Sequence, residues 1–267
     1  MALIPRQFID SVVSIGSRNS DNSISWFGTG FFVGRSIDDP NKVVPFLVTN
    51  KHVLQSSKQI VVRMKENGSE RLMEMDVILE NDGLPLYKIH PQNDIDIAVL
   101  QLDASVILDK NLIFQGFNID TQALSSVELR EEGVDEGSLI YMLGFPMGLV
   151  NQTSNLPLCR LGCIARMSEA QINEDHNMLV DVQNFPGNSG SPIVLRPDAS
   201  AIIGTKSLNR SVLVGIIHSY IPYQEQLVNS QTRRVVEIRS ENSGIANAHP
   251  IEYIRDVIDL YLPSPNL

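Results

Sequence analysis

The sequence is poor in cysteine, in positive charge and in long apolar runs, and each shortage argues against a class of protein. Its 267 residues include two cysteines, and 21 Lys and Arg stand against 31 Asp and Glu, a formal net charge of −10. A nucleic-acid partner needs a basic surface to bind phosphate. Apolar runs such as SVLVGII fall far short of the roughly 20 residues that cross a bilayer. We therefore expect neither nucleic acid nor membrane among the partners.

The N-terminus and the two cysteines favour a reducing compartment. The stretch MALIPRQFIDSVVSIG has no long apolar core and no small-residue cleavage site, so it is not a signal peptide. Cys159 and Cys163 would lie roughly 13 Å apart in an extended strand, whereas disulfide Cα atoms lie within about 7 Å. They could pair only if Gly162 breaks the strand, and CxxxC without a nearby histidine is a weak zinc motif. We expect reduced thiols, no metal and a cytoplasmic protein.

Short apolar segments of strand length recur throughout the chain and are separated by turn residues. ENGS, between VVRMK and ERLMEM, is typical of a hairpin connection. A helical spacing of apolar residues occurs only at the end, in AHPIEYIRDVIDLYL. The polar stretch 103–137 is the best candidate for an inter-domain connection. This pattern predicts an all-β protein, a sandwich or barrels, with one terminal helix.

The stretch NFPGNSGSP, residues 184–192, contains a serine that is either a turn residue or a nucleophile. Asn, Gly, Ser and Pro are common in turns, so Ser189 alone decides nothing. A serine becomes a strong nucleophile when a base takes its proton and a third group orients that base. The chain must therefore supply a histidine and a carboxylate in equally well-defined settings.

His52 is the best candidate base, because it directly follows the apolar strand VVPFLVTN, and a strand end can present a side chain to a cleft. Asp96 begins the strand DIAVLQL and, by strand alternation, points the same way as buried residues. A buried carboxylate needs a partner such as a histidine N–H. Asp94 satisfies the same argument. We assign surface or capping positions to His90, His176 and His249.

The chain order His52, Asp96, Ser189 is that of the chymotrypsin type and differs from subtilisin and the α/β-hydrolases. The sequence resembles the chymotrypsin-fold serine proteases, and more closely the bacterial trypsin-like and HtrA-type protease domains. The matching motifs cover nearly the whole chain in the family's order: GTGFFV (28–33), VTNKHV (48–53), DIAVLQL (96–102), EGSLIYMLGFPMG (136–148), PGNSGSP (186–192), LVGIIHS (213–219) and NSGIANAHPIEYIRDVI (242–258).

The resemblance implies two six-stranded antiparallel β-barrels and a C-terminal α-helix. Residues 1–115 would form the barrel that carries His52 and Asp96. Residues 116–245 would form the connection and the barrel that carries Ser189, and residues 246–267 the helix and tail. The implied activity is that of a serine endopeptidase without a cofactor, acting on a protein or peptide. Ser189 would be the nucleophile, His52 the general base and Asp96 the group that orients it. The implied oxyanion hole is the loop Gly187, Asn188 and Ser189, with the N–H groups of Gly187 and Ser189 as donors.

The sequence departs from the family at several positions. Asn188 stands where zymogen-activated relatives carry an aspartate that pairs with a new N-terminus, so we do not expect activation by cleavage there. Val53 follows His52 where many secreted relatives have a disulfide cysteine. HtrA-type proteins usually continue into a PDZ domain, and we expect no regulation through such a domain. A cytoplasmic protease without a zymogen step must be restrained, so we expect a regulatory partner protein or a disordered oxyanion loop.

The resemblance places the primary specificity pocket between the residues before Ser189 and the strand after LVGI. Gln183 is neutral where proteases that cut after Lys or Arg carry a carboxylate, and the ring of Tyr220 should make the pocket shallow. We expect cleavage after small or medium uncharged residues, because an unpaired buried cation is costly. The expected substrate-binding residues are Gln183, Asn184, Phe185, Pro186, His218, Ser219 and Tyr220.

Three other hypotheses belong to different classes. One is a structural β protein with an incidental match, and the joint match of the motifs in order and setting argues against it. A catalytically silent protease fold, used as a binding or scaffolding module, usually lacks a member of the triad, and here all three residues are present. An esterase of the α/β-hydrolase kind requires G-x-S-x-G, alternating helices and a different order of the triad, and residue 191 is Ser.

Overall fold

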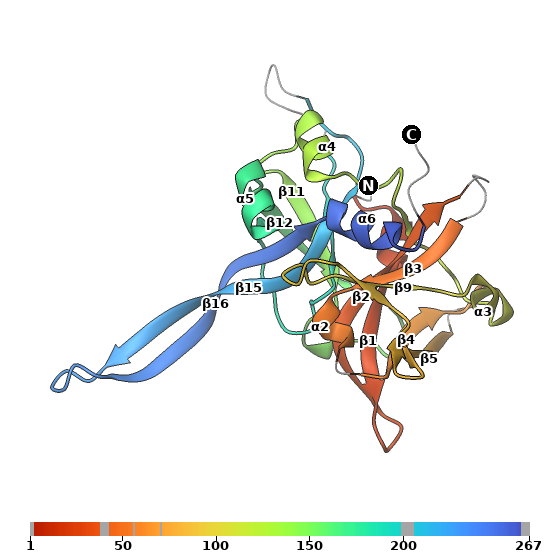
Figure 1. Cartoon of the computed structure of the whole chain (residues 1–267), viewed down its shortest axis with the longest axis horizontal. Helices are drawn as coiled ribbons and strands as arrows, with labels where there is room; N and C mark the ends of the chain where they lie inside the picture. The colour runs from red at the N-terminus through yellow and green to blue at the C-terminus, as the bar shows by residue number, and fades with distance from the viewer. Residues whose placement is uncertain (1–2, 38–42, 56, 70, 199–205, 263–267) are drawn as a thin grey trace.

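The computed structural model describes residues 3–37, 43–55, 57–69, 71–198 and 206–262. Two strand-rich halves pack together, helices lie at the periphery, and a two-stranded arm projects from the body (Figure 1). The all-β class and the C-terminal helix are as the sequence predicts. The division into three sequence segments stays a prediction.

The first half is one sheet of eight strands. Its path runs β5-β4-β1-β2-β3-β9-β8, with β10 pairing with β2 in parallel. The hairpin expected around ENGS is present as the pair β4 and β5. The strands are β1 (Val12–Arg18), β2 (Ile24–Ser36), β3 (Val43–Thr49), β4 (Gln59–Lys65), β5 (Leu72–Ile78), β8 (Lys88–Ile89), β9 (Ala98–Gln101) and β10 (Phe117–Asn118), and β6 (Glu80–Asn81) and β7 (Leu84–Pro85) form a separate small hairpin.

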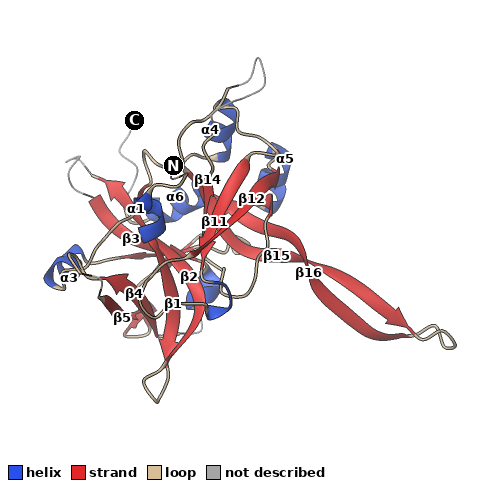
Figure 2. Cartoon of the chain, turned by 180° about the vertical axis from the view of Figure 1, so that it is seen from behind, coloured by secondary structure: helices blue, strands red, loops and turns tan. Residues whose placement is uncertain are grey.

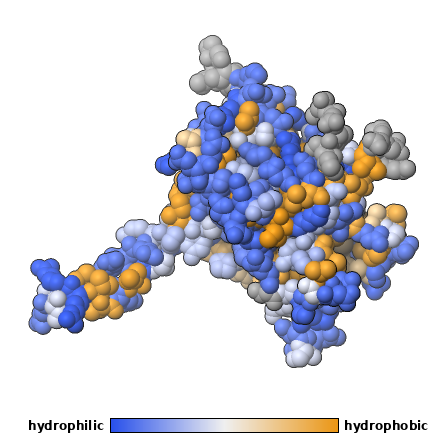
Figure 3. Space-filling view, viewed as in Figure 1, coloured by the Kyte–Doolittle hydropathy of each residue, from blue (hydrophilic) through white to orange (hydrophobic). Residues whose placement is uncertain are grey.

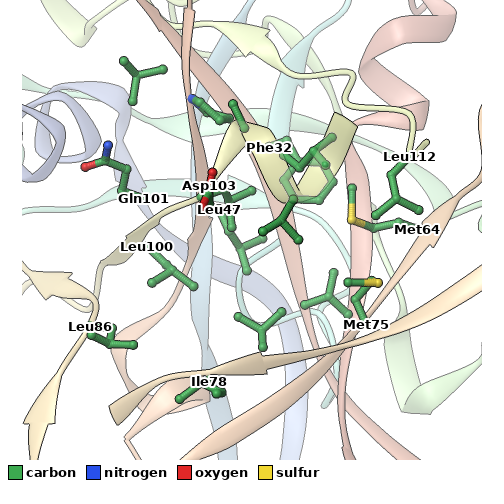
Figure 4. A pocket seen from close by; sticks show the side chains of 18 of the residues that line it. Phe32, Leu47, Met64, Met75, Ile78, Leu86, Leu100, Gln101, Asp103 and Leu112 are labelled. Atoms are coloured by element: carbon green, nitrogen blue, oxygen red, sulfur yellow. The ribbon is translucent and has the colours of Figure 1, made fainter. Parts of the chain in front are cut away.

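This first sheet does not close in the part of the chain that the structure describes, because β5 and β8 end its path without pairing with each other. It therefore differs from a closed six-stranded barrel. The opening leads to an apolar cavity of about 870 Å³ (Figure 4). Leu47, Met64, Met75, Leu100 and Leu112 line its interior, so this cavity is the open interior of the first half.

The second half is the expected closed barrel of six strands, in the order β11-β12-β13-β16-β15-β14, and all its neighbouring strands are antiparallel. Cys159 and Cys163 both lie on β12 and are free. The strands are β11 (Leu139–Gly144), β12 (Leu158–Arg166), β13 (Met178–Asp181), β14 (Pro192–Leu195), β15 (Leu213–Val228) and β16 (Val235–Pro250).

The terminal helix is α6 (Ile251–Asp259), which buries Ile251, Ile254, Val257 and Ile258 on one face. The expectation that no other helix would occur is wrong. The others have four to seven residues, which is too short for a helical period to show in the sequence. They are α1 (Arg6–Asp10), α2 (Lys51–Leu54), α3 (Ala104–Asp109), α4 (Ser126–Glu131) and α5 (Glu169–Asp175), with a 3₁₀ turn, η1 (Pro146–Gly148). No helix among the described residues is long and apolar enough to span a membrane.

A hydrophobic cluster between the two halves joins them to α6. It includes Phe31 and Phe117 from the first sheet, Phe145 after β11, and Ile254 from the helix. Arg35, only 2% exposed, pairs with Asp120 and Asp259 at 3.1 and 2.7 Å and so also ties β2 to α6. Smaller clusters fill each half. The two halves are therefore packed as one body.

Strands β15 and β16 extend far beyond the barrel as a paired arm (Figures 1 and 2). Each strand has 16 residues. The sequence predicts only two short, separate strands here, SVLVGIIHS and RRVVEIRS. The polar stretch QEQLVNSQTRR has the composition of a connection, but main-chain pairing between the strands does not depend on apolar side chains.

The two halves approach closely at Gly190. A Cβ atom there would overlap the Thr29 carbonyl oxygen and Thr49 Oγ1, and Gly190 has φ +88°. Gly83, in the β6–β7 turn, has a similar φ of +80° but no neighbour within 4 Å of a built Cβ. Substitutions at Gly190 and Gly83 therefore separate two energetic costs: that of left-handed backbone, and that of steric overlap between the two halves.

We expect Gly83→Ala to lower the free energy of unfolding by about 1 kcal/mol, the cost of left-handed backbone alone. Gly190→Ala should lower it by about 3 kcal/mol or more, because steric overlap adds to that cost. Urea unfolding monitored by circular dichroism measures both. Equal losses in the two variants would contradict the close approach.

Candidate active site

His52 and Asp96 meet at one end of the first sheet. His52 lies in α2, directly after β3, and Asp96 lies two residues before β9, the strand that pairs with β3. His52 Nδ1 is hydrogen-bonded to the Asp96 carboxylate, and the His52 backbone N–H donates to Asp96 Oδ1 at 3.0 Å. Burial by itself raises the pKa of Asp96, but the hydrogen bonds and charge of His52 outweigh it and lower the pKa. Asp96 is thus an anion held against the imidazole.

The backbone of Asp96 is held from two further sides. Asn50 Nδ2 donates to the Asp96 carbonyl at 2.8 Å, and the Asp96 N–H donates to His249 Nε2 at 2.9 Å. Asp94, the other candidate carboxylate, instead pairs with His176 Nε2 at 3.3 Å. Of the two aspartates, Asp96 is therefore the one in contact with His52.

His249 is a neutral, buried support beneath Asp96. Its Nδ1 lies 2.8 Å from the His176 carbonyl, which can only accept, so Nδ1 carries the proton and Nε2 is free to accept from Asp96. The His249 ring stacks on the His218 ring, with 4.1 Å between the ring centroids. Burial is the main cause that lowers the pKa of His249 to about 4 and the pKa of His218 to about 3.

The expectation of surface or capping positions is wrong for His90 and His249, whereas His176 is the C-cap of α5. His249 is fully buried, His90 is 6% exposed, and the rings of His90 and His176 both meet Tyr253 edge-on. These contacts join segments far apart in the chain, which strand alternation does not reveal. In the described residues, no group of three or more His, Cys, Asp or Glu is arranged to hold a metal ion.

Thr29 of β2 holds the loop that carries Ser189. Its N–H donates to the Ser189 carbonyl at 2.9 Å, and its Oγ1 donates to the Gly187 carbonyl at 2.7 Å. Oγ1 also accepts from the Phe145 N–H at 3.0 Å. Thr29 is fully buried, so these bonds are shielded from water. They fix which way the loop carbonyls point.

The N–H groups of Gly187 and Ser189 have no hydrogen-bond partner among the described residues, whereas the amides of Asn188, Gly190 and Ser191 all do. The Pro186 carbonyl accepts from Met147 at 2.6 Å, so the Gly187 N–H of the same trans peptide points the opposite way. The Asn188 carbonyl accepts from Ser191 at 2.9 Å, and the Ser189 N–H points away from it in turn. Two donors beside the Ser189 side chain are thus left available.

Ser189 lies beside the end of β3, and that strand ends three residues before His52. Its neighbour Gly190 packs against Thr49, three residues before His52, and Thr49 Oγ1 donates to the Thr29 carbonyl at 2.7 Å. No hydrogen bond joins Ser189 Oγ to His52 Nε2 in the described part of the chain. Such bonds are often long in the absence of substrate and shorten when it binds. The His52 side chain is 48% exposed and so remains accessible.

The Asn188 side chain points into the protein. The residue is fully buried against Gly144. Neither its side-chain Oδ1 nor its side-chain Nδ2 has a hydrogen-bond partner in the described residues. A neutral amide can remain buried in this way at a cost of about 1–3 kcal/mol, whereas a carboxylate there would need a cation.

The residues expected to form the pocket divide into two groups. Gln183 and Tyr220 are exposed, and the Phe185 ring lies 5.1 Å from the Arg160 guanidinium. His218, by contrast, stacks on His249 and hydrogen-bonds Asn177 at 2.7 Å, so its ring belongs to the support beneath Asp96. Asn184 is buried; its Nδ2 donates to the Ser219 carbonyl at 3.0 Å, and its own carbonyl accepts from Asn242.

Sequence reasoning missed Thr29, Asn50, Arg160 and the role of His249. Thr29 and Asn50 lie inside motifs that the sequence analysis singles out, GTGFFV and VTNKHV, so a polar residue amid buried strand residues was the available signal. Nothing in the local sequence marks His249 or Arg160, because their partners come from distant segments.

The buried histidines predict a loss of stability in acid. A histidine whose folded pKa lies below its unfolded value of about 6.5 binds its proton only after unfolding, so the free energy of unfolding falls as the pH drops from about 6.5 to about 4. For His249 the loss is on the order of 3 kcal/mol. Urea unfolding of wild type and His249→Gln across this range should show a shallower pH dependence in the variant. Equal slopes would contradict a neutral, buried His249.

Comparisons with known proteins identify the family of the chain. The chain is similar to the MamO protease domain from Magnetospirillum magneticum in its apo form, with 13% identity over 93% of this chain and 96% of that chain and a TM-score of 0.47. No curated protein matches the sequence. Residues 28–204 match the model of the trypsin-like peptidase domain. Since that match covers more than half of its length, the chain belongs to the trypsin-like peptidase family.

Proposed function

We propose that the protein is a serine endopeptidase that forms an acyl-enzyme on Ser189. The observation that carries the proposal is the hydrogen-bonded pair of His52 and Asp96. This pair follows Thr49, which packs against Gly190 of the Ser189 loop, and that loop has two available N–H groups. A partly buried anion, a half-exposed imidazole and a serine in the family's order supply the parts that acyl transfer requires.

In the proposed mechanism, His52 Nε2 takes the proton of Ser189 Oγ as the oxygen attacks the scissile carbonyl. The N–H groups of Gly187 and Ser189 stabilise the resulting oxyanion. His52 then gives its proton to the departing amine, and the C–N bond breaks to leave the acyl-enzyme. Water, activated by the same imidazole, releases the acid and regenerates Ser189. Asp96 stays ionised throughout and stabilises the imidazolium, as its lowered pKa favours.

Kinetics of substituted proteins test these roles. Ser189→Ala or His52→Ala should reduce turnover by about six orders of magnitude, and Asp96→Asn by about four. Asp94→Asn is the matched control, since Asp94 contacts His176 and should retain turnover within about threefold. Hydrolysis of an internally quenched peptide library provides the assay. Loss of activity in the Asp94 variant and not in the Asp96 variant would refute the assignment of the acid.

A silent scaffold is the alternative, and the lack of a hydrogen bond between Ser189 and His52 is the observation that favours it. A serine-directed phosphonate separates the two functions. A catalytic protein forms an adduct on Ser189 that disappears in His52→Ala, whereas a scaffold forms none under any condition.

We also propose that the pocket rejects basic side chains. Gln183 supplies no negative charge, and Arg160 places a positive charge beside Phe185. The Arg160 Nε is buried without a hydrogen-bond partner in the described residues, so a carboxylate does not neutralise it there. A substrate Lys or Arg would meet a like charge in a partly buried setting. Small or medium uncharged residues such as Ala, Val, Leu and Thr fit this environment best.

Cut-site profiling on a proteome-derived peptide library measures this preference. Lys and Arg should be depleted before the cut, and Arg160→Gln should relieve part of that depletion. Arg166→Gln, an exposed position on the same strand, should leave the profile unchanged. Enrichment of Lys or Arg before the cut in wild type would overturn this account of the pocket.

The remaining proposals concern the setting of the protein. Two free thiols, one of them exposed, support a reducing compartment and hence the cytoplasm. The buried, uncharged Asn188 supports activity without cleavage at an N-terminus. A regulatory partner protein therefore remains our proposal for how such a protease is restrained.

A further inference from the structure

Among the described residues, one edge of β15 has no neighbouring strand from the Ser189 loop to the end of the arm. Its pairing with β14 covers Leu213 to Ile216, whereas its pairing with β16 continues to Val228. Beyond Ile216 no strand of the described chain pairs with β15 on the β14 side. The Ser219 carbonyl already accepts from Asn184 Nδ2 at 3.0 Å, so the main-chain groups available to an added strand start at Tyr220.

This free edge begins beside Ser189. The Gly190 N–H donates to the Ile217 carbonyl at 3.0 Å, and the Ile217 N–H donates to the Ser191 carbonyl at 2.9 Å. The loop and β15 run antiparallel here, so the step from Gly190 back to Ser189 leads along β15 toward Ser219. A polypeptide whose scissile carbonyl lies at Ser189 would meet the start of the free edge.

The arm itself lacks a third strand and a core. Two-stranded ribbons are marginal in water unless a further strand or helix packs on them. The register places Gln224 opposite Ser240 and Gln226 opposite Ile238, which makes one face uncharged. Hydrophobic side chains remain exposed toward the tip, as Figure 3 shows; they include Val228, Val235, Val236 and Ile238.

We propose that the free edge of the β15 arm binds the substrate polypeptide as an added strand. This inference rests on the proposed protease function and names its substrate class: extended, unstructured chain segments that continue for about eight or more residues on the N-terminal side of the cut. Main-chain hydrogen bonds supply the affinity, as in other strand additions, and the uncharged face of the arm favours uncharged residues at alternate positions.

The direction follows from the sheet. Both existing neighbours of β15 are antiparallel to it, and antiparallel pairs are the more stable. An antiparallel substrate runs from the tip toward Ser189, so its N-terminal part lies along the arm. The edge from Tyr220 to Val228 is roughly 27 Å long at the usual strand rise. Pro222 offers no N–H, so the pairing is interrupted at that residue.

The test uses peptides with one Leu before the cut and either an N-terminal or a C-terminal extension of alternating Thr and Gln. For wild type, kcat/KM should rise at least tenfold as the N-terminal extension grows from three to ten residues, and stay flat for C-terminal extensions. A variant in which Asn-Gly replaces residues 223–241 should cleave the short peptide normally and lose the gain. N-methylation of every second extension residue removes main-chain N–H donors. It should abolish the gain in kcat/KM when the methylated residues are those whose N–H groups face β15, and leave it when they are the residues in between.

Binding and labelling controls separate this inference from the proposed function. Ser189→Ala with the full arm should bind the long peptide at least tenfold more tightly than its arm-shortened counterpart. Equal phosphonate labelling of Ser189 in the two arm forms shows that the site is intact. A wild type that is not labelled overturns the protease proposal and this inference with it. Labelling without any length dependence, or an arm whose removal changes only the oligomeric state in sedimentation, overturns the inference alone.

Discussion

The bonds of Thr29 are the constraint on which the site depends. One buried threonine accepts from the Phe145 N–H and donates to the carbonyls of Gly187 and Ser189. Because the peptide unit is planar and trans, turning a carbonyl toward β2 turns the next N–H away from it. The threonine therefore orients the peptide units that carry the Asn188 and Gly190 N–H groups and joins the two halves. The Gly187 and Ser189 N–H groups are oriented by the bonds from Met147 to Pro186 and from Ser191 to Asn188. Gly190 permits the close approach that these contacts require.

Asp96 depends on a second constraint, a set of histidines that stay neutral. Burying a charge without a partner costs several kcal/mol, so a protonated ring beneath Asp96 would destabilise the fold. His249 avoids this cost because its neutral form satisfies both contacts: Nδ1 donates to the His176 carbonyl, and Nε2 accepts from the Asp96 N–H. The lone negative charge of Asp96 is then directed to His52, whose ring is the accessible one. The accessible His52 is therefore the proposed base, whereas the buried His249 supports the backbone of Asp96.

The sequence was sufficient for those features that depend on local pattern. Strand position and chain order give His52, Ser189 and either Asp94 or Asp96 as candidates, and helical spacing identifies α6. What it could not show are features made by contacts between distant segments: the packing of His249 under Asp96, the choice between Asp94 and Asp96, and Thr29 as the support of the loop. The arm was missed for a different reason. Its strands are held by main-chain pairing with few buried side chains, so they leave no apolar period.

The free edge of β15 runs from the Ser189 loop along the arm. The functions proposed for the loop and for the arm both depend on covalent catalysis at Ser189. The central claim is tested most directly by trapping the intermediate. A slowly deacylating ester is mixed with the protein, the reaction is quenched in acid, and intact mass and peptide mapping follow. The account predicts one acyl group, located on Ser189 and absent from Ser189→Ala. Ester hydrolysis without any acylated protein, or acylation that maps to Cys159 instead, would contradict it.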